Sequence, residues 1–135
     1  MTGLVVLAAA LVLTGVLAGL HRRADGRVRA RDGREDLRPL LPMSGTTATL
    51  LQFSSAFCAP CRATKRTLSE VAALVPGVEH VEIDAESHLD LVRRLNILKT
   101  PTTLVLNASG HEVLRAAGQP RKEHVLAALD SAVAS

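Results

Sequence analysis

Hydrophobic residues occur in blocks along the chain, and the spacing within each block predicts a strand or a helix. Four blocks have the apolar content and flanking turn residues of strands: 46–53, 77–84, 100–107 and 111–118. The last two are joined by a tight turn at 108–110, which predicts a hairpin. Helical spacing predicts helices over 59–75, from Ser87 onward, and after Pro120. The predicted order is therefore β-α-β-α-β-β-α, with no internal repeat.

Each predicted helix has an apolar face and a recognisable boundary. The first ends at Pro76, and the second opens with a capping-box pattern formed by Ser87 and Asp90. The third begins at Pro120, a residue type that suits the first turn of a helix. The residues expected to face the core are Cys61, Leu68, Ala72 and Val75 in the first helix, Leu91, Val92 and Leu95 in the second, and Val125, Leu126, Leu129, Ala132 and Val133 in the third.

The first 20 residues contain no charged side chain. At about 1.5 Å of rise per helical residue, they are just long enough to cross a hydrocarbon core of roughly 30 Å. We predict an uncleaved transmembrane anchor over residues 1–20. The alternative is a cleaved signal peptide, for which the small residues around Ala18 offer a cleavage site. The cationic stretch that normally precedes such a segment is missing from this sequence.

Positive charge is concentrated immediately after the apolar segment. Residues 21–38 hold seven arginines and four acidic residues, and this surplus equals the formal net charge of +3 of the whole chain. The rest of the chain is balanced, which excludes a basic face for nucleic acid. We expect residues 21–44 to form a solvated, flexible, arginine-rich linker that can also contact anionic membrane lipid. Residues 45–135 then form the folded domain.

The linker also predicts the orientation of the chain in a membrane. Five of its arginines lie within the range in which positive charge retains a flank in the cytoplasm: Arg22, Arg23, Arg27, Arg29 and Arg31. We therefore predict a single-pass protein of the cell membrane whose folded domain faces the cytoplasm. An extracytoplasmic domain is the alternative.

The chain has only two cysteines, Cys58 and Cys61, and both lie where a strand is expected to give way to a helix. At a helix start, unpaired N–H groups and the positive end of the macrodipole favour a thiolate at Cys58. Cys61 is one turn along, close enough to attack a mixed disulfide formed at Cys58. Ala59 and Pro60 form the loop between them, and Pro60 restricts it.

A C-x-x-C pair is also half of a structural zinc site. Zinc needs four ligands, and no two of the five histidines have ligand spacing. The strand-helix setting therefore favours a redox-active pair, and we predict no bound metal.

With these elements in order, the sequence resembles the thioredoxin family over residues from about 46 to 133. The matching features are CAPC at 58–61 after an apolar strand, EID at 82–84, TPT at 100–102, Gly110 in the hairpin and Gly118 before the last helix. The resemblance implies a thioredoxin-like α/β fold with a central mixed four-stranded sheet.

The resemblance also implies a substrate-binding surface. In the family, the proline of the TPT stretch is cis and faces the active-site disulfide, so Pro101 is expected beside Cys58. The backbone of Thr100 would then be available to pair with an extended substrate segment. Phe57, just before the first cysteine, would keep an apolar surface beside the thiol.

Several positions depart from the family pattern. Gln52 occupies a position that is usually a buried Asp, and an amide cannot exchange a proton near neutral pH, so Cys61 is expected to resolve mixed disulfides slowly. His80 lies where the family often has a Lys near the floor of the active site. We expect a solvent-facing strand position for it, with a modulator of the active site as the alternative. The arginine-rich linker replaces the leading strand and helix of the family.

These features predict a membrane-tethered thiol-disulfide oxidoreductase that reduces protein disulfides through its dithiol and needs no cofactor of its own. Its expected partners are protein disulfide substrates and an electron donor, either a flavin-dependent thioredoxin reductase or a membrane electron carrier. One alternative is an exported reductase of the cytochrome-maturation type. Another is a redox-inactive adaptor that holds a partner on the surface around Phe57 and Pro101.

Overall fold

The computed structural model describes residues 1–31, 33, 35–43, 45 and 47–135. The helices are α1 (Thr2–Ala24), α2 (Ala59–Leu74), α3 (Leu89–Arg94) and α4 (Lys122–Val133), with single 3-10 turns η1 (Arg38–Leu40) and η2 (Ala85–Ser87). The strands are β1 (Val28–Ala30), β2 (Ala48–Ser54), β3 (Val78–Asp84), β4 (Thr102–Asn107) and β5 (Glu112–Ala117). From β2 onward, the predicted element order is confirmed.

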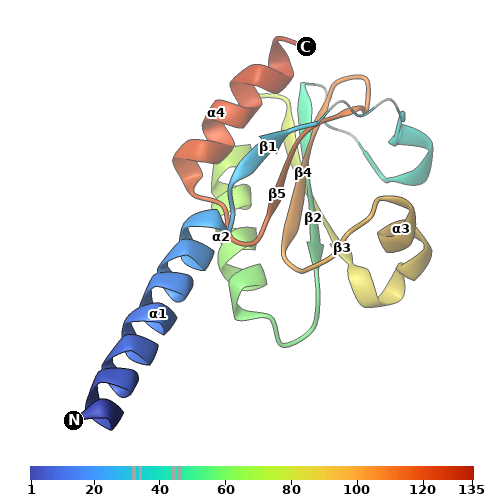
Figure 1. Cartoon of the computed structure of the whole chain (residues 1–135). Helices are drawn as coiled ribbons and strands as arrows, with labels where there is room; N and C mark the ends of the chain where they lie inside the picture. The colour runs from blue at the N-terminus through green and yellow to red at the C-terminus, as the bar shows by residue number, and fades with distance from the viewer. Residues whose placement is uncertain (32, 34, 44, 46) are drawn as a thin grey trace.

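The five strands form one mixed sheet in the order β1-β5-β4-β2-β3 (Figure 1). β2 and β3 are parallel, with Phe53 opposite Ile83, and the other neighbouring pairs are antiparallel. β4 and β5 form the predicted hairpin. The prediction of four strands was one short, because β1 adds to β5 at the edge of the sheet.

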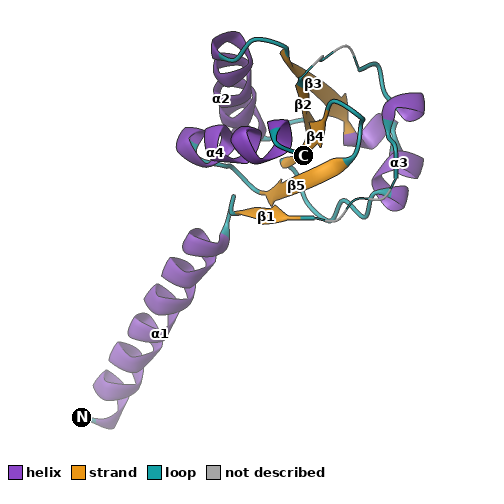
Figure 2. Ribbon diagram, turned by 90° about the horizontal axis from the view of Figure 1, so that it is seen from above, coloured by secondary structure: helices purple, strands orange, loops and turns teal. Residues whose placement is uncertain are grey.

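The central strand β2 is buried along its whole length and serves two cores. Its side chains alternate between faces, so Leu50 packs with α2 and α4 whereas Leu51 and Phe53 pack with α3 and η1. Figure 2 shows α2 and α4 on one side of the sheet and α3 on the other. The first core includes Leu68, Val71, Val105, Val125 and Leu129, and the second includes Leu37, Leu41, Leu95, Ile97, Leu104 and Leu106. The domain is thus a sheet covered by helices on both faces.

Two local predictions about the helices were wrong. The capping box at Ser87 does not form, because Asp84 accepts hydrogen bonds from the backbone N–H of Glu86 and from Ser87 Oγ, and α3 begins only at Leu89. Asp84 therefore caps a 3-10 turn that delays the helix. In α4, Val133 is exposed.

The expectation of a solvated, flexible linker over residues 21–44 is also wrong for the part that the structure describes. β1 pairs with β5 over three residues, and Leu37 is 1% exposed within the α3-side core. The Leu37 N–H donates to Gly110 O at 3.0 Å. A bidentate Arg38 guanidinium holds the pKa of Asp36 at about 2, against an ordinary 3.8. This arm is an edge element of the domain, on the side away from β3.

The junction between α1 and β1 is equally well defined. α1 continues to Ala24, past the predicted end at residue 20. Asp25 forms an ion pair with Lys99 at 2.6 Å, and the Gly26 N–H donates to Ala117 O at 2.8 Å. Gly26 has a φ of +69°, and a Cβ there would lie 1.9 Å from the carbonyl oxygen of Gln119, so only glycine fits.

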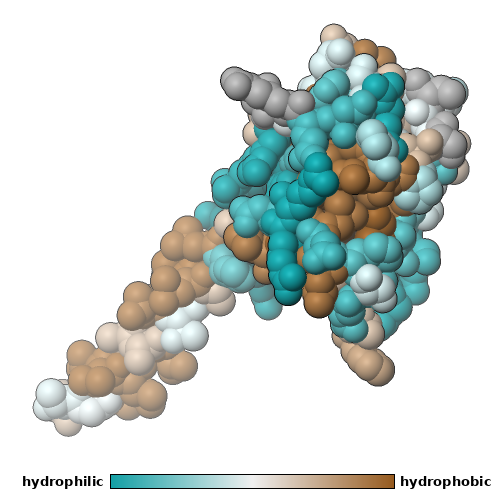
Figure 3. Space-filling model, turned by 90° about the vertical axis from the view of Figure 1, so that its right-hand side faces the viewer, coloured by the Kyte–Doolittle hydropathy of each residue, from teal (hydrophilic) through white to brown (hydrophobic). Residues whose placement is uncertain are grey.

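α1 projects from the domain and none of its residues is buried. Figure 3 shows this helix as mostly apolar, whereas much of the visible domain surface is hydrophilic. Its length and composition are those of a helix that can cross a membrane, and a signal sequence near the N-terminus has the same properties.

The burial of Leu37 gives a test of how firmly the arm is integrated. Leu37→Ala is expected to lower the free energy of unfolding by about 2–5 kcal/mol, because it opens a cavity in a packed core. The measurement is a urea titration of the full chain in detergent, followed by circular dichroism. Leu40→Ala, on the exposed side of the same 3-10 turn, should change it by only about 0.5 kcal/mol. Equal small effects would mean that the arm is detached in solution.

Candidate active site

Cys58 is the N-cap residue of α2, directly after the loop that follows β2. Its Sγ accepts a hydrogen bond from the Cys61 N–H at 3.2 Å. Pro60 lies in the first turn, where its missing N–H leaves no orphan donor. When the pair is reduced, this contact and the positive end of the helix dipole favour a thiolate at Cys58.

The two sulfurs differ in exposure and are joined in a disulfide. Their Cα atoms lie 5.2 Å apart. Cys58 is partly exposed, whereas Cys61 is 3% exposed and faces the core. An outside reactant can therefore reach Cys58 first.

Phe57 stands at the tip of the loop before Cys58 with its side chain fully exposed. Its φ of +56° lies in the left-handed region, which is uncommon for a bulky residue. Such backbone strain is found preferentially at functional sites, where the surrounding structure maintains it.

The Thr100–Pro101 peptide bond is cis, as the resemblance implied. Thr100 Oγ1 and Ser55 Oγ form a hydrogen bond of 2.7 Å, which brings this turn beside the loop that leads to Cys58. Pro101 is buried, and its carbonyl accepts from the Gly118 N–H at 2.7 Å. The turn is therefore held from both sides.

Gln52 is completely buried below the cysteine pair, and its amide is fully used. Its Nε2 donates to Cys61 O and to Ser54 Oγ, both at 2.9 Å, and its Oε1 lies 2.9 Å from His80 Nε2. Because a carbonyl oxygen can only accept, these contacts require Nε2 of His80 to carry a proton.

His80 is not a solvent-facing strand residue, so the expected position is wrong. Its ring is half-buried between β3 and α2, with Nε2 toward Gln52 and Nδ1 3.2 Å from Ser69 Oγ. Burial lowers the pKa of His80 below its ordinary 6.5; the charge of Glu82 opposes this shift and that of Lys65 adds to it. The histidine is therefore neutral at pH 7 and bonded at both nitrogens.

Sequence reasoning missed the hydroxyl groups that complete this arrangement. Ser55 fixes the cis-proline turn and Ser69 orients His80. Single serines in a loop or on a helix carry no recognisable pattern, so no signal pointed to them. Lys65, on the same side of α2 as Ser69, forms an ion pair with Glu82 at 3.2 Å. Among the described residues, no group of three His, Cys, Asp or Glu side chains is placed to hold a metal ion.

A family model described as a thioredoxin-like domain matches residues 42–132, which is more than half of the chain. The chain belongs to the thioredoxin-like family. The curated mouse protein "Thioredoxin domain-containing protein 2" is 29% identical over 90 residues, which are 67% of this chain. The chain spans only 18% of the length of that relative.

Solved thioredoxins have the same fold. A chloroplastic thioredoxin z is 27% identical, with a TM-score of 0.60, and the match covers 67% of this chain and 81% of that one. A thioredoxin from Nicotiana alata is 23% identical, with a TM-score of 0.57 over 64% of this chain and 74% of that one. The resemblance proposed from the CAPC and TPT motifs and the predicted thioredoxin-like fold are thus confirmed. Together, this fold and the Cys58–Cys61 pair support a thiol-disulfide redox function.

Proposed function

We propose that this thioredoxin-like protein is a protein-disulfide reductase held at a membrane by α1. The Cys58 thiolate attacks one sulfur of a substrate disulfide, forming a mixed disulfide and releasing the other substrate sulfur as a thiolate. Cys61 then attacks the Cys58 sulfur, which closes the Cys58–Cys61 disulfide and releases the second substrate thiol. The dithiol supplies both electrons, so no bound cofactor takes part.

The observation that carries this proposal is the asymmetry of the pair. A partly exposed sulfur caps a helix and receives an N–H bond, and a buried sulfur lies within bonding reach of it. These are the properties required of a nucleophile and of a resolving thiol. The thiols are recharged by an external donor, either a thioredoxin reductase or a membrane electron carrier.

The substrate segment lies across the surface formed by Phe57 and the cis-proline turn. The exposed ring of Phe57 offers apolar contact, and the backbone of Thr100 offers hydrogen bonds to an extended chain. Ala59 and Pro60, both exposed, form the part of the loop that the substrate passes.

Gln52 and His80 act as positioning residues for the resolving cysteine. Gln52 fixes the Cys61 carbonyl, and His80 is the titratable group joined to that carbonyl through the Gln52 amide. A protonated His80 brings positive charge toward Cys61 and favours its thiolate. Because burial lowers the pKa of His80, this assistance operates only on the acidic side of pH 6.5.

The trapping of mixed disulfides tests the function. In full-length Cys61→Ser, substrates are expected to accumulate on Cys58, because no second thiol resolves them. They should appear as higher-mass bands on non-reducing gels of membranes alkylated at acid pH. Cys58→Ser is the matched control and should trap nothing. Failure of both variants to trap would favour the adaptor function.

The role of His80 is tested with a mixed disulfide between Cys58 and a small thiol. The measurement is the pH dependence of the rate at which Cys61 displaces the small thiol and closes the Cys58–Cys61 disulfide. His80→Gln removes the titratable ring. At pH 5 wild type is expected to close roughly threefold faster than this variant, because a positive charge on His80 raises the fraction of Cys61 that is present as thiolate. Above pH 7 the two rates should converge. His124→Gln, at the exposed start of α4, should follow wild type. Parallel profiles for His80→Gln and wild type would rule out the positioning role.

Arginines in the last turn of α1 and directly after it support an anchor whose domain faces the cytoplasm, and labelling tests this orientation. Ala30→Cys in a Cys58→Ser/Cys61→Ser background places one reporter on exposed β1. In intact cells this thiol should resist a membrane-impermeant maleimide and react after lysis. Thr2→Cys in the same background, at the opposite end of α1, should react without lysis. The reverse pattern would place the domain outside the cytoplasm.

A further inference from the structure

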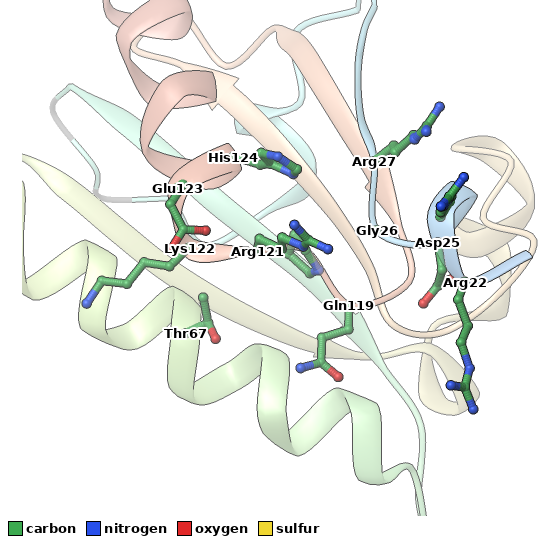
Figure 4. A pocket seen from close by; sticks show the side chains of 12 residues that line it. Arg22, Asp25, Gly26, Arg27, Thr67, Gln119, Arg121, Lys122, Glu123 and His124 are labelled. Carbon is green, nitrogen blue, oxygen red and sulfur yellow. The ribbon is translucent and has the colours of Figure 1, made fainter. Parts of the chain in front are cut away.

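A basic pocket lies where α1 meets the folded domain. This junction pocket is about 660 Å³ in volume and is lined chiefly by residues between 22 and 27 and by residues 119–124. Figure 4 shows the labelled side chains of the α1–β1 connection on one side and those at the start of α4 on the other. The two segments are almost one hundred residues apart in sequence, so the pocket exists only because β1 and β5 hold the arm against the domain.

The pocket carries a surplus of positive charge. Its charged walls consist of Arg22, Arg23, Arg27, Arg121 and Lys122, opposed by the carboxylates of Asp25 and Glu123. Asp25 is already paired with Lys99, and Lys122 with Glu70. Within the described ranges, none of the four arginines has a carboxylate partner. Guanidinium groups that line one pocket and have no carboxylate partner favour an anion as their counterion.

The backbone at the start of α4 adds to this preference. The N-cap residue is Arg121, which provides no side-chain acceptor for the N–H groups of the first turn. The positive end of the helix dipole therefore points to the pocket together with the guanidinium groups.

The position of the pocket at the end of α1 indicates which kind of anion would be available to it. Its uncharged segment ends at Leu20, and Arg22 and Arg23 follow directly on the same helix. A segment of 20 residues spans about 30 Å, so the pocket begins where a membrane-crossing α1 leaves the hydrocarbon and enters the phosphate layer. Lipid phosphates are concentrated at this level, and arginine binds phosphate oxygens in bidentate fashion.

We infer that the junction pocket binds the phosphate of an anionic phospholipid headgroup. The lipid is held by the arginines of the arm together with Arg121 of the folded domain, so it joins the domain to the bilayer surface. This inference rests on the membrane-spanning part of the proposed function and is independent of the thiol chemistry.

Native mass spectrometry of the full chain in nonionic detergent tests the inference. Wild type is expected to retain phosphatidylglycerol in preference to phosphatidylcholine. In Arg27→Gln/Arg121→Gln the apparent affinity for phosphatidylglycerol should fall at least about tenfold, since each arginine at a membrane surface contributes roughly fivefold. The control Arg62→Gln/Arg66→Gln removes two exposed arginines from α2, outside the pocket, and should keep wild-type affinity.

Three results would overturn the inference: equal retention of the two lipids, equal losses in the two double variants, or retention of inorganic phosphate that millimolar phosphatidylglycerol does not displace. Unchanged circular dichroism shows that each variant is folded. Carbonate extraction of membranes tests the membrane anchor separately from the lipid-binding pocket. A chain that stays in the membrane but lacks lipid selectivity refutes the pocket alone, whereas release of the chain refutes the anchor.

Discussion

The burial of β2 on both faces is the constraint on which the rest of the structure depends. All of its residues are covered, so a shift in register by one position would exchange the two cores, and the strand has one permitted alignment with β3 and β4. Cys58 follows this strand after a short loop, so the packing that fixes β2 also fixes the position of Cys58. Gln52 in the same strand then holds the carbonyl of Cys61, so one element positions both cysteines.

The local, periodic features of the chain were predictable, and its long-range pairings were not. Apolar spacing located β2 to β5, α2 and α4, and the CAPC motif located the redox pair. β1 escaped prediction because Val28 is flanked by arginines and the strand is only three residues long, too short for an alternating pattern to show. The burial of Leu37 and the position of His80 depend on elements that are distant in sequence, and a single sequence carries no signal for either.

Gln52 occupies a buried position that is usually an acid in this family. The amide keeps the core uncharged, but it cannot take up or release a proton as the acid can. A carboxylate at this depth pays a large desolvation penalty when it is charged, whereas the amide makes three hydrogen bonds and carries no charge. A titratable group, His80, lies one hydrogen bond further out and is still partly accessible to solvent. In the proposed reaction, the same change that removes a buried charge would weaken the acid-base control of the resolving thiol.

The short connection between α1 and β1 leaves the domain little freedom to move relative to α1. Only residues 25–27 separate the two elements, and Asp25 and Gly26 are both bonded to the domain. A flexible tether would let an enzyme search a hemisphere of solvent. With α1 in a membrane, as proposed above, a domain fixed in this way would move in a plane at one height above the bilayer. It would meet by lateral diffusion those disulfides that are displayed at that height, so the proposed anchor would limit the accessible substrates before any contact with the active site.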